Sequence, residues 1–271
     1  MPRPSALLAL LLAAAATGAV SPVSPRPSTV VVTTSLLESA VREVLPQDAD
    51  IRVVCLLPPS SCPGHFDLSP RMVPLLLSAS LVIRHDYQSA LDEKLADMGV
   101  KDVSLVTVTA EGSLLDPGAY RRMVEQAASA LRARYPEREA EFNTRVAQVQ
   151  ARIDSLEASM RERAKPWRGT QVVASFHQKL LCERLGFEVT EVLKRSEELT
   201  PRDWEQLLRA RAEMVVANLQ EGSGGAESLG KRKHLPVAVL SNFPGVPGYG
   251  ADYYGLMDAN LRRLEAAWRK R

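Results

Sequence analysis

The sequence predicts an α/β protein of two lobes, each a parallel sheet flanked by helices, joined by one long rigid α-helix. Short β-branched segments alternate with segments of helical periodicity over residues 29–135, and the alternation starts again over residues 166–271. Such alternation is typical of a right-handed parallel sheet. Between the two regions, residues 137–164 contain no glycine or proline and place an apolar residue every three to four positions. We therefore expect a linking helix over residues 136–165.

The amino-terminal segment has the composition of a secretory signal peptide. A basic start is followed by an apolar segment over residues 6–16 and by small residues up to Ala19. The apolar segment is too short to span a bilayer as a stable helix. We expect a signal peptide over residues 1–19, an extended leader over residues 20–28 and export to the periplasm. No cysteine lies near the expected cleavage point, so we expect a soluble product without a lipid anchor.

Charge and hydropathy exclude two broad classes of protein. The formal net charge is +2, with basic and acidic residues interleaved, so the sequence offers no nucleic-acid surface. Beyond the amino terminus there is no second apolar stretch of about 18 residues, so we do not expect an integral membrane protein. Nothing in the sequence indicates oligomerisation, and we expect a monomer.

The cysteine count is odd, which is unusual for an exported protein. At least one of Cys55, Cys62 and Cys182 is therefore expected to be unpaired or metal-bound. Two interpretations of Cys55 remain open. It forms a local disulfide with Cys62, or it is a core residue of a strand, because proximity in sequence says nothing about the geometry of the two side chains.

Each lobe is expected to consist of four strands that alternate with helices. In the first lobe we expect Ser35 to cap the first helix, and in the second lobe Thr200 to cap the helix that follows it. The predicted strands cover residues 29–33, 51–57, 81–83, 103–108, 170–174, 187–193, 214–219 and 236–240. The predicted helices cover residues 35–45, 72–78, 90–98, 118–135, 177–185, 201–211 and 253–269, with a further helix ending near Lys231.

A rigid loop follows the second predicted strand and ends at a histidine. Pro58, Pro59 and Pro63 fix the backbone and Gly64 permits a close approach, so we expect His65 at the carboxyl edge of the sheet. Ligands of open α/β sheets bind at this edge. A neutral imidazole there is a good metal ligand. The alternative for a lone histidine in such a loop is that it caps a turn.

Further donor groups are expected close to His65. Cys62 precedes it by three residues and is a potential second metal donor. The third predicted strand delivers His85 and Asp86 to the same edge of the sheet. Asp67 and Asp86, each close to a candidate histidine, either orient an imidazole N–H group or cap a helix. His234 lies in a Lys-Arg-Lys-His segment and is interpreted as part of a solvated basic turn.

The whole mature chain resembles the zinc and manganese solute-binding components of ABC transporters, whose two lobes are joined by a single long helix. The matching segments occur in the family's order and spacing. They are Val-Val-Thr-Thr at 31–34, Leu-Leu-Pro-Pro at 56–59, the Pro-Gly-His65 loop, Leu81-Val-Ile, Leu115-Asp116-Pro117, the long helix, Ala174-Ser-Phe-His177, Asp252-Tyr253 and Asn260-Leu261. The resemblance implies a periplasmic protein that captures a divalent metal ion in the cleft between the lobes. It would deliver the ion to an inner-membrane ABC permease, without catalysis.

The family's metal ligands are only partly present in this chain. Its first ligand matches His65, and its third, just after the first strand of the second lobe, matches His177. The second, a histidine four residues before an Asp-Pro pair, falls on Gly112, which cannot coordinate a metal. The fourth, an aspartate after the last strand, falls near Ser241 and Asn242.

We expect His85 to replace one of the missing ligands. Three neutral imidazoles, from His65, His85 and His177, favour Zn²⁺ over the harder Mn²⁺. The fourth donor remains open among Cys62, Asn242, Asp252 and water.

Two other functions remain open. Three histidines with an open coordination position would also suit a zinc-dependent exported hydrolase, with Asp67 or Glu221 as general base. The sequence contains no HExxH signature for such an enzyme. The missing family ligands favour the second alternative, a degenerate site that binds a chelated metal, another ligand or a partner protein.

Overall fold

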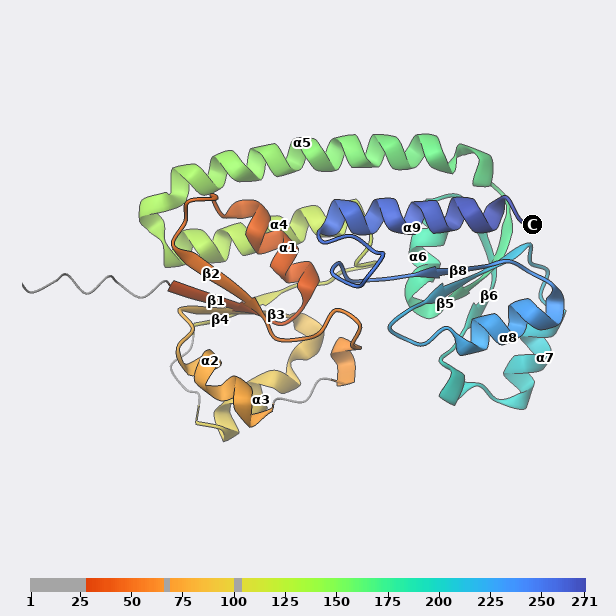
Figure 1. Ribbon diagram of the computed structural model, residues 1–271, viewed down its shortest axis with the longest axis horizontal. Helices are drawn as coiled ribbons and strands as arrows, with labels where there is room; N and C mark the ends of the chain where they lie inside the picture. Colours follow the sequence, from red (N-terminus) through yellow and green to blue (C-terminus); the bar gives the residue numbers. More distant parts are fainter. Residues whose placement is uncertain (1–27, 66–68, 100–103) are drawn as a thin grey trace, which may run out of the picture.

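The computed structural model describes residues 28–65, 69–99 and 104–271. The predicted signal peptide, all but the last residue of the predicted leader, and Asp67 lie outside these residues. Within them, the chain forms two four-stranded parallel sheets with helices on their faces, one sheet in each lobe (Figure 1). The predicted fold class is confirmed.

The first sheet has the strand order β2-β1-β3-β4. Val32 at the end of β1 pairs with Cys55 of β2 on one side and with Ile83 of β3 on the other, so the carboxyl ends of the strands share one edge. The strands are β1 (Ser28–Val32), β2 (Ile51–Cys55), β3 (Leu81–His85) and β4 (Leu105–Val108). The helices of this lobe are α1 (Ser35–Val44), α2 (Val73–Leu77), α3 (Ala90–Asp97) and α4 (Pro117–Arg134), with 3₁₀ turns η1 (Pro63–His65), η2 (Pro70–Met72), η3 (Asp86–Gln88) and η4 (Pro136–Arg138).

The cap of α1 is Thr34, and the prediction of Ser35 was wrong. Thr34 has an extended backbone, and its hydroxyl accepts a hydrogen bond from the backbone N–H of Leu37. Ser35 is already helical, and its hydroxyl donates instead to the carbonyl of Pro244 in the other lobe, at 2.7 Å. The side chain that looked like a cap therefore joins the two lobes.

The second sheet repeats the topology of the first, with the order β6-β5-β7-β8. Thr200 caps α7 as predicted, with its hydroxyl and the Asp203 side chain forming a reciprocal capping box. The strands are β5 (Gln171–Ser175), β6 (Glu188–Leu193), β7 (Met214–Asn218) and β8 (Val237–Leu240). The helices are α6 (Lys179–Arg184), α7 (Pro201–Arg209) and α8 (Gly224–Lys233), with 3₁₀ turns η5 (Lys165–Trp167), η6 (Phe176–Gln178) and η7 (Ser196–Glu198).

Two helices run between the lobes. The linking helix α5 (Glu139–Ala164) has 26 residues, so it is about 39 Å long, and it lies along both lobes (Figure 1). Its buried side chains are those of the predicted apolar face and include Phe142, Val149 and Ile153. The last helix, α9 (Tyr253–Trp268), begins against the first lobe and packs along β8 of the second. None of the described helices is both long and apolar enough to cross a membrane.

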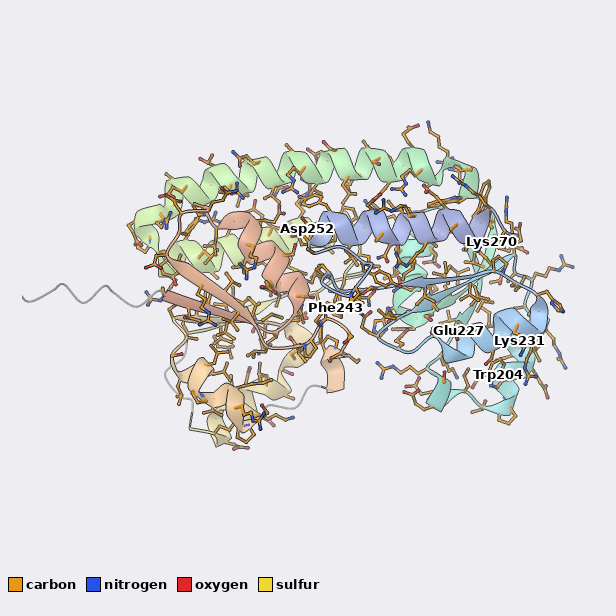
Figure 2. The ribbon with its side chains drawn as sticks, viewed as in Figure 1. Trp204, Glu227, Lys231, Phe243, Asp252 and Lys270 are labelled. Atoms are coloured by element: carbon orange, nitrogen blue, oxygen red, sulfur yellow. The ribbon has the colours of Figure 1, made fainter. Side chains whose placement is uncertain are left out.

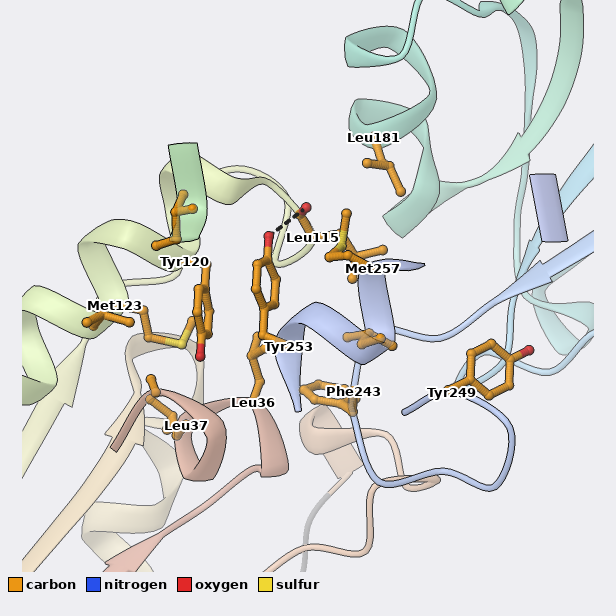
Figure 3. Close-up of a cluster of buried hydrophobic side chains, with 14 of the residues drawn as sticks. Leu36, Leu37, Leu115, Tyr120, Met123, Leu181, Phe243, Tyr249, Tyr253 and Met257 are labelled. Atoms are coloured by element: carbon orange, nitrogen blue, oxygen red, sulfur yellow. Dashed lines mark hydrogen bonds between the residues drawn. The ribbon is translucent and has the colours of Figure 1, made fainter. Parts of the chain in front are cut away.

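A stack of two tyrosines joins the lobes at the start of α9. The rings of Tyr253 and of Tyr120 on α4 are nearly parallel, with their centroids 3.7 Å apart, and both side chains are fully buried (Figure 3). The Tyr253 hydroxyl donates to the carbonyl of Leu115, and its backbone N–H donates to the Ser39 hydroxyl on α1. The buried apolar residues around this stack form one continuous core that includes both sheets. The lobes are therefore packed as a unit.

We predict that Tyr253→Ala lowers the free energy of unfolding by about 3–5 kcal/mol, because it leaves a cavity where the lobes meet. Tyr253→Phe keeps the stack and loses one hydrogen bond, so its cost should be about 1 kcal/mol. Urea denaturation measures both values, with Leu208→Ala on the exposed side of α7 as a control. A Tyr253→Ala variant as stable as that control would show that the stack does not hold the lobes together.

Candidate metal site

His177 lies where a ligand is expected, directly after a strand at the carboxyl edge of the second sheet. It belongs to η6, which follows β5, while Glu221 lies in the loop after the neighbouring strand β7. The adjacency of β5 and β7 brings the two side chains together, and Nδ1 of His177 forms a short hydrogen bond with Oε1 of Glu221. The Glu221 backbone N–H in turn donates to the Asn218 side chain at 3.0 Å, which holds this loop in place.

The hydrogen bond to Glu221 determines which nitrogen of His177 is available. A carboxylate only accepts, so Nδ1 carries the proton and Nε2 keeps its lone pair. A metal-binding histidine usually donates its second N–H to a carboxylate in this way, which orients the ring and raises its basicity. The Glu221 side chain is 7% exposed and that of His177 is 45% exposed, so the carboxylate is buried behind a ring that reaches solvent.

A cavity of about 410 Å³ lies between the lobes in front of His177. Phe243, in the loop after β8, lies at this junction (Figure 2). The cavity is lined from the first lobe by Cys62, Pro63, Gly64, Tyr87, Ala110, Gly112 and Leu114, and from the second by Phe176, His177, Arg195, Asn218, Gln220, Glu221, Asn242 and Phe243. The carboxyl edges of the two sheets therefore face each other across one space, as the fold predicted.

The proline-rich loop of the first lobe extends to this cavity. Its 3₁₀ turn η1 ends at His65, and the preceding Gly64 lines the cavity. Two hydrogen bonds attach the loop to the second lobe, from Gln220 Nε2 to the carbonyl of Pro59 at 3.0 Å and from Arg195 Nη2 to Sγ of Cys62 at 3.4 Å. The His65 side chain lies outside the described part of the structure, so its role as a ligand stays a prediction.

His85 lies behind the wall of the cavity. Its side chain is completely buried at the end of β3, and Nε2 is 3.0 Å from the Thr34 hydroxyl. Its ring stacks on Tyr87 with centroids 4.9 Å apart, and Tyr87 is the residue that lines the cavity. Nδ1 has no hydrogen-bond partner among the described residues. The structure does not bring His85 beside His177, and its role as a third ligand also stays a prediction.

The three protein candidates for the fourth donor differ in position. Cys62 lines the cavity and accepts the hydrogen bond from Arg195. Asn242 also lines it, but its Oδ1 accepts from Gln178 Nε2 at 2.8 Å and is already engaged. Asp252 caps α9 through the backbone N–H of Gly255 and lines a different cavity, away from His177.

The comparisons with known proteins agree with this geometry. A family described as "Zinc-uptake complex component A periplasmic" matches residues 30–267. The chain belongs to this family. Members of the zinc-uptake family are periplasmic or extracellular metal-binding proteins that function with ABC transporter permeases and are generally not enzymes. No curated relative matches the sequence.

Solved structures with the zinc-uptake fold are similar over nearly their whole length. A crystal structure of ZnuA has 14% identity and a TM-score of 0.74, covering 89% of this chain and 98% of its own. The laminin-binding protein Lbp of Streptococcus pyogenes has 16% identity and a TM-score of 0.73, covering 90% and 99%. A Mn-bound periplasmic metal-binding protein from Candidatus Liberibacter asiaticus has 13% identity and a TM-score of 0.72, covering 88% and 98%.

This member of the zinc-uptake family has open space at one expected ligand position. Gly112 lines the cavity with a positive φ of 77°, and no atom lies within 4 Å of the place where a Cβ would be. The main functional residue that the sequence did not assign as part of the site is Glu221, which was considered only as a general base. Its signal was its position just after a buried strand, on the same sheet edge as His177.

The other sequence interpretations are resolved by local contacts. Asp86 accepts hydrogen bonds from the backbone N–H groups of Tyr87 and Ala110, so it acts as a cap. The cysteines, all within the described residues, are unpaired, and burial raises the pKa of Cys55 and of Cys182 to about 12. His234 is exposed and ends α8 in a left-handed conformation, as expected for a solvated turn.

We predict that His85 makes the metal-free protein sensitive to mild acid. Burial lowers its pKa from 6.5 to about 4, opposed weakly by the charge of Asp86. The unfolded chain therefore binds a proton near pH 6.5 while the folded protein does not. Its contribution is complete above pH 6.5, and about 3 kcal/mol is lost as the pH falls to 4.

Urea denaturation of chelator-stripped protein at pH 7.5, 6, 5 and 4 tests this prediction. His85→Gln cannot titrate, so its stability should fall less steeply than that of the wild type across this window. Parallel pH profiles for the two proteins would contradict it.

Proposed function

We propose that this chain captures Zn²⁺ in the cavity between its lobes and delivers it to an ABC permease of the inner membrane. The observation that supports this most directly is the pair formed by His177 and Glu221. A carboxylate-oriented imidazole with its Nε2 free to coordinate, at the carboxyl edge of a parallel sheet, is the arrangement expected of a metal site. Membership of the zinc-uptake family supports the same function.

The proposed ligands come from both lobes. His177 supplies Nε2 from the second lobe, and His65 supplies an imidazole from the loop whose neighbour Gly64 lines the cavity. Cys62 lines the same cavity, and a thiolate there would add to the preference for Zn²⁺ over Mn²⁺. His85 joins this set if its ring leaves Thr34 and moves past Tyr87.

We propose that binding and release depend on the proline-rich loop rather than on wide closure of the lobes. The lobes share one hydrophobic core, so a large hinge motion would expose apolar surface. The loop is attached to the second lobe by the hydrogen bonds at Pro59 and Cys62. Breaking two hydrogen bonds costs far less than separating the core, so the loop is the element suited to open.

We propose that the site has no catalytic role. Glu221, a candidate general base for a hydrolase, is engaged by His177 Nδ1 and is buried behind it. In that position it orients the ring rather than facing a metal-bound water. Zinc-dependent ester or peptide hydrolysis that is abolished by Asp67→Ala would support the hydrolase instead.

We predict that His177→Ala weakens Zn²⁺ binding by more than about 100-fold, and that Glu221→Gln weakens it by about 10–100-fold because the ring loses its orienting charge. Isothermal titration of chelator-stripped protein measures both affinities. His234→Ala is the matched control, since this exposed histidine lies at the end of α8. Unchanged affinity in His177→Ala would refute the proposed site.

The same titration defines the remaining ligands. Loss of a true ligand should weaken binding by at least about tenfold, so we expect this for His65→Ala. His85→Gln and Cys62→Ser decide the other two positions. A His85→Gln protein that binds Zn²⁺ like the wild type would remove His85 from the ligand set.

Delivery to a permease is tested in the organism that encodes the chain. We predict that deleting the gene slows growth when zinc is limiting, and that the wild-type gene, but not one encoding His177→Ala, restores it. Added Zn²⁺ should also restore growth. A deletion strain that grows normally under zinc limitation and takes up zinc at the normal rate would contradict the transport function.

A further inference from the structure

We propose that the substrate is a Zn²⁺ ion already bound to a small carboxylate-bearing chelator, rather than the bare ion. This inference rests on the proposed function, because it places the ion at His177. It adds the chemical class of the molecule that completes the coordination and occupies the rest of the cavity.

The size of the cavity is the first reason. A zinc ion held by four ligands at about 2.0–2.3 Å needs almost no space beyond the ligand atoms themselves. The cavity in front of His177 has about 410 Å³, and an adjoining hollow of about 700 Å³ shares His177, Arg195 and Glu221 with it. Sites for small organic molecules have about 300–1,000 Å³. The space fits a metal complex better than a single ion.

The shortage of protein ligands is the second reason. Among the described residues that line the cavity, Glu221 is the sole carboxylate, and it is engaged by His177. Gly112 contributes no side chain, and the amide oxygen of Asn242 is engaged by Gln178. Coordination positions around the ion are therefore left for oxygen or nitrogen atoms of another molecule.

The charge of the lining is the third reason. Arg195 places a guanidinium group in the cavity wall, where it repels a bare dication and attracts a carboxylate. Asn218 also lines the cavity. It is completely buried, its Oδ1 accepts from Glu221, and its Nδ2 has no hydrogen-bond partner among the described residues. A buried unsatisfied N–H group is costly, and a carboxylate oxygen of a bound chelator would satisfy it.

These features have complementary roles. His177 would coordinate the zinc, while Arg195 and Asn218 would bind the carboxylate groups of the chelator. Polycarboxylates such as citrate and amino acids such as histidine have this chemistry, so both are suitable probes.

The test compares Zn²⁺ alone with Zn²⁺ mixed with one equivalent of citrate or of histidine. Isothermal titration gives the affinities, and native mass spectrometry gives the mass of the complex. We expect at least one chelator to be retained with zinc in a 1:1:1 complex, and to tighten binding by at least about tenfold, which is about 1.4 kcal/mol. Zinc bound without either chelator, with both chelators acting as competitors, would overturn the inference.

Variants separate this inference from the proposed function. Arg195→Gln should lose most of the enhancement by the chelator and keep the affinity for Zn²⁺ alone. Lys231→Gln removes the same charge from α8, at the far end of the second lobe (Figure 2), and should behave as wild type. Arg195→Gln with the full enhancement would refute the chelator site alone. Failure of His177→Ala to reduce binding of Zn²⁺, with or without chelator, would refute the proposed function as well.

Discussion

The packing of Tyr253 against Tyr120 is the contact on which the arrangement of the molecule depends. It inserts the start of the last helix between α1 and α4 of the first lobe, although the rest of that helix packs on the second sheet. Two separate sheets thereby share one core, and their carboxyl edges are held facing each other. Because separating the lobes would expose this core to water, the space between them is a permanent feature of the fold.

The candidate metal site follows from that constraint. Parallel strands place their carboxyl ends at one edge, so the segments after β5 and β7 meet there and His177 is bonded to Glu221. The first lobe contributes the proline-rich loop, which has few rotatable backbone angles and is attached through Pro59 and Cys62. A rigid framework with one locally attached loop allows an ion to enter and leave without unfolding the core.

Most of the fold was predictable because each element has a local cause. The apolar period of α5, the β-branched strands and the cap at Thr200 are properties of short segments, and their predicted ends fall close to the observed ones. The site was predicted less completely. His177 was found from its position after a strand, but Glu221 was not assigned as its partner, and His85 was placed at the right edge without its burial being foreseen.

The sequence by itself determined the order of strands and helices, the long linking helix and the sheet edge at which the candidate ligands lie, since these depend on local periodicity and on the rules of parallel sheets. Only the tertiary structure decided which side chains face the cavity. The ring of His85 is turned toward Thr34 and covered by Tyr87, while Arg195 and Asn218 line the space, and such orientations result from packing between segments far apart in the chain.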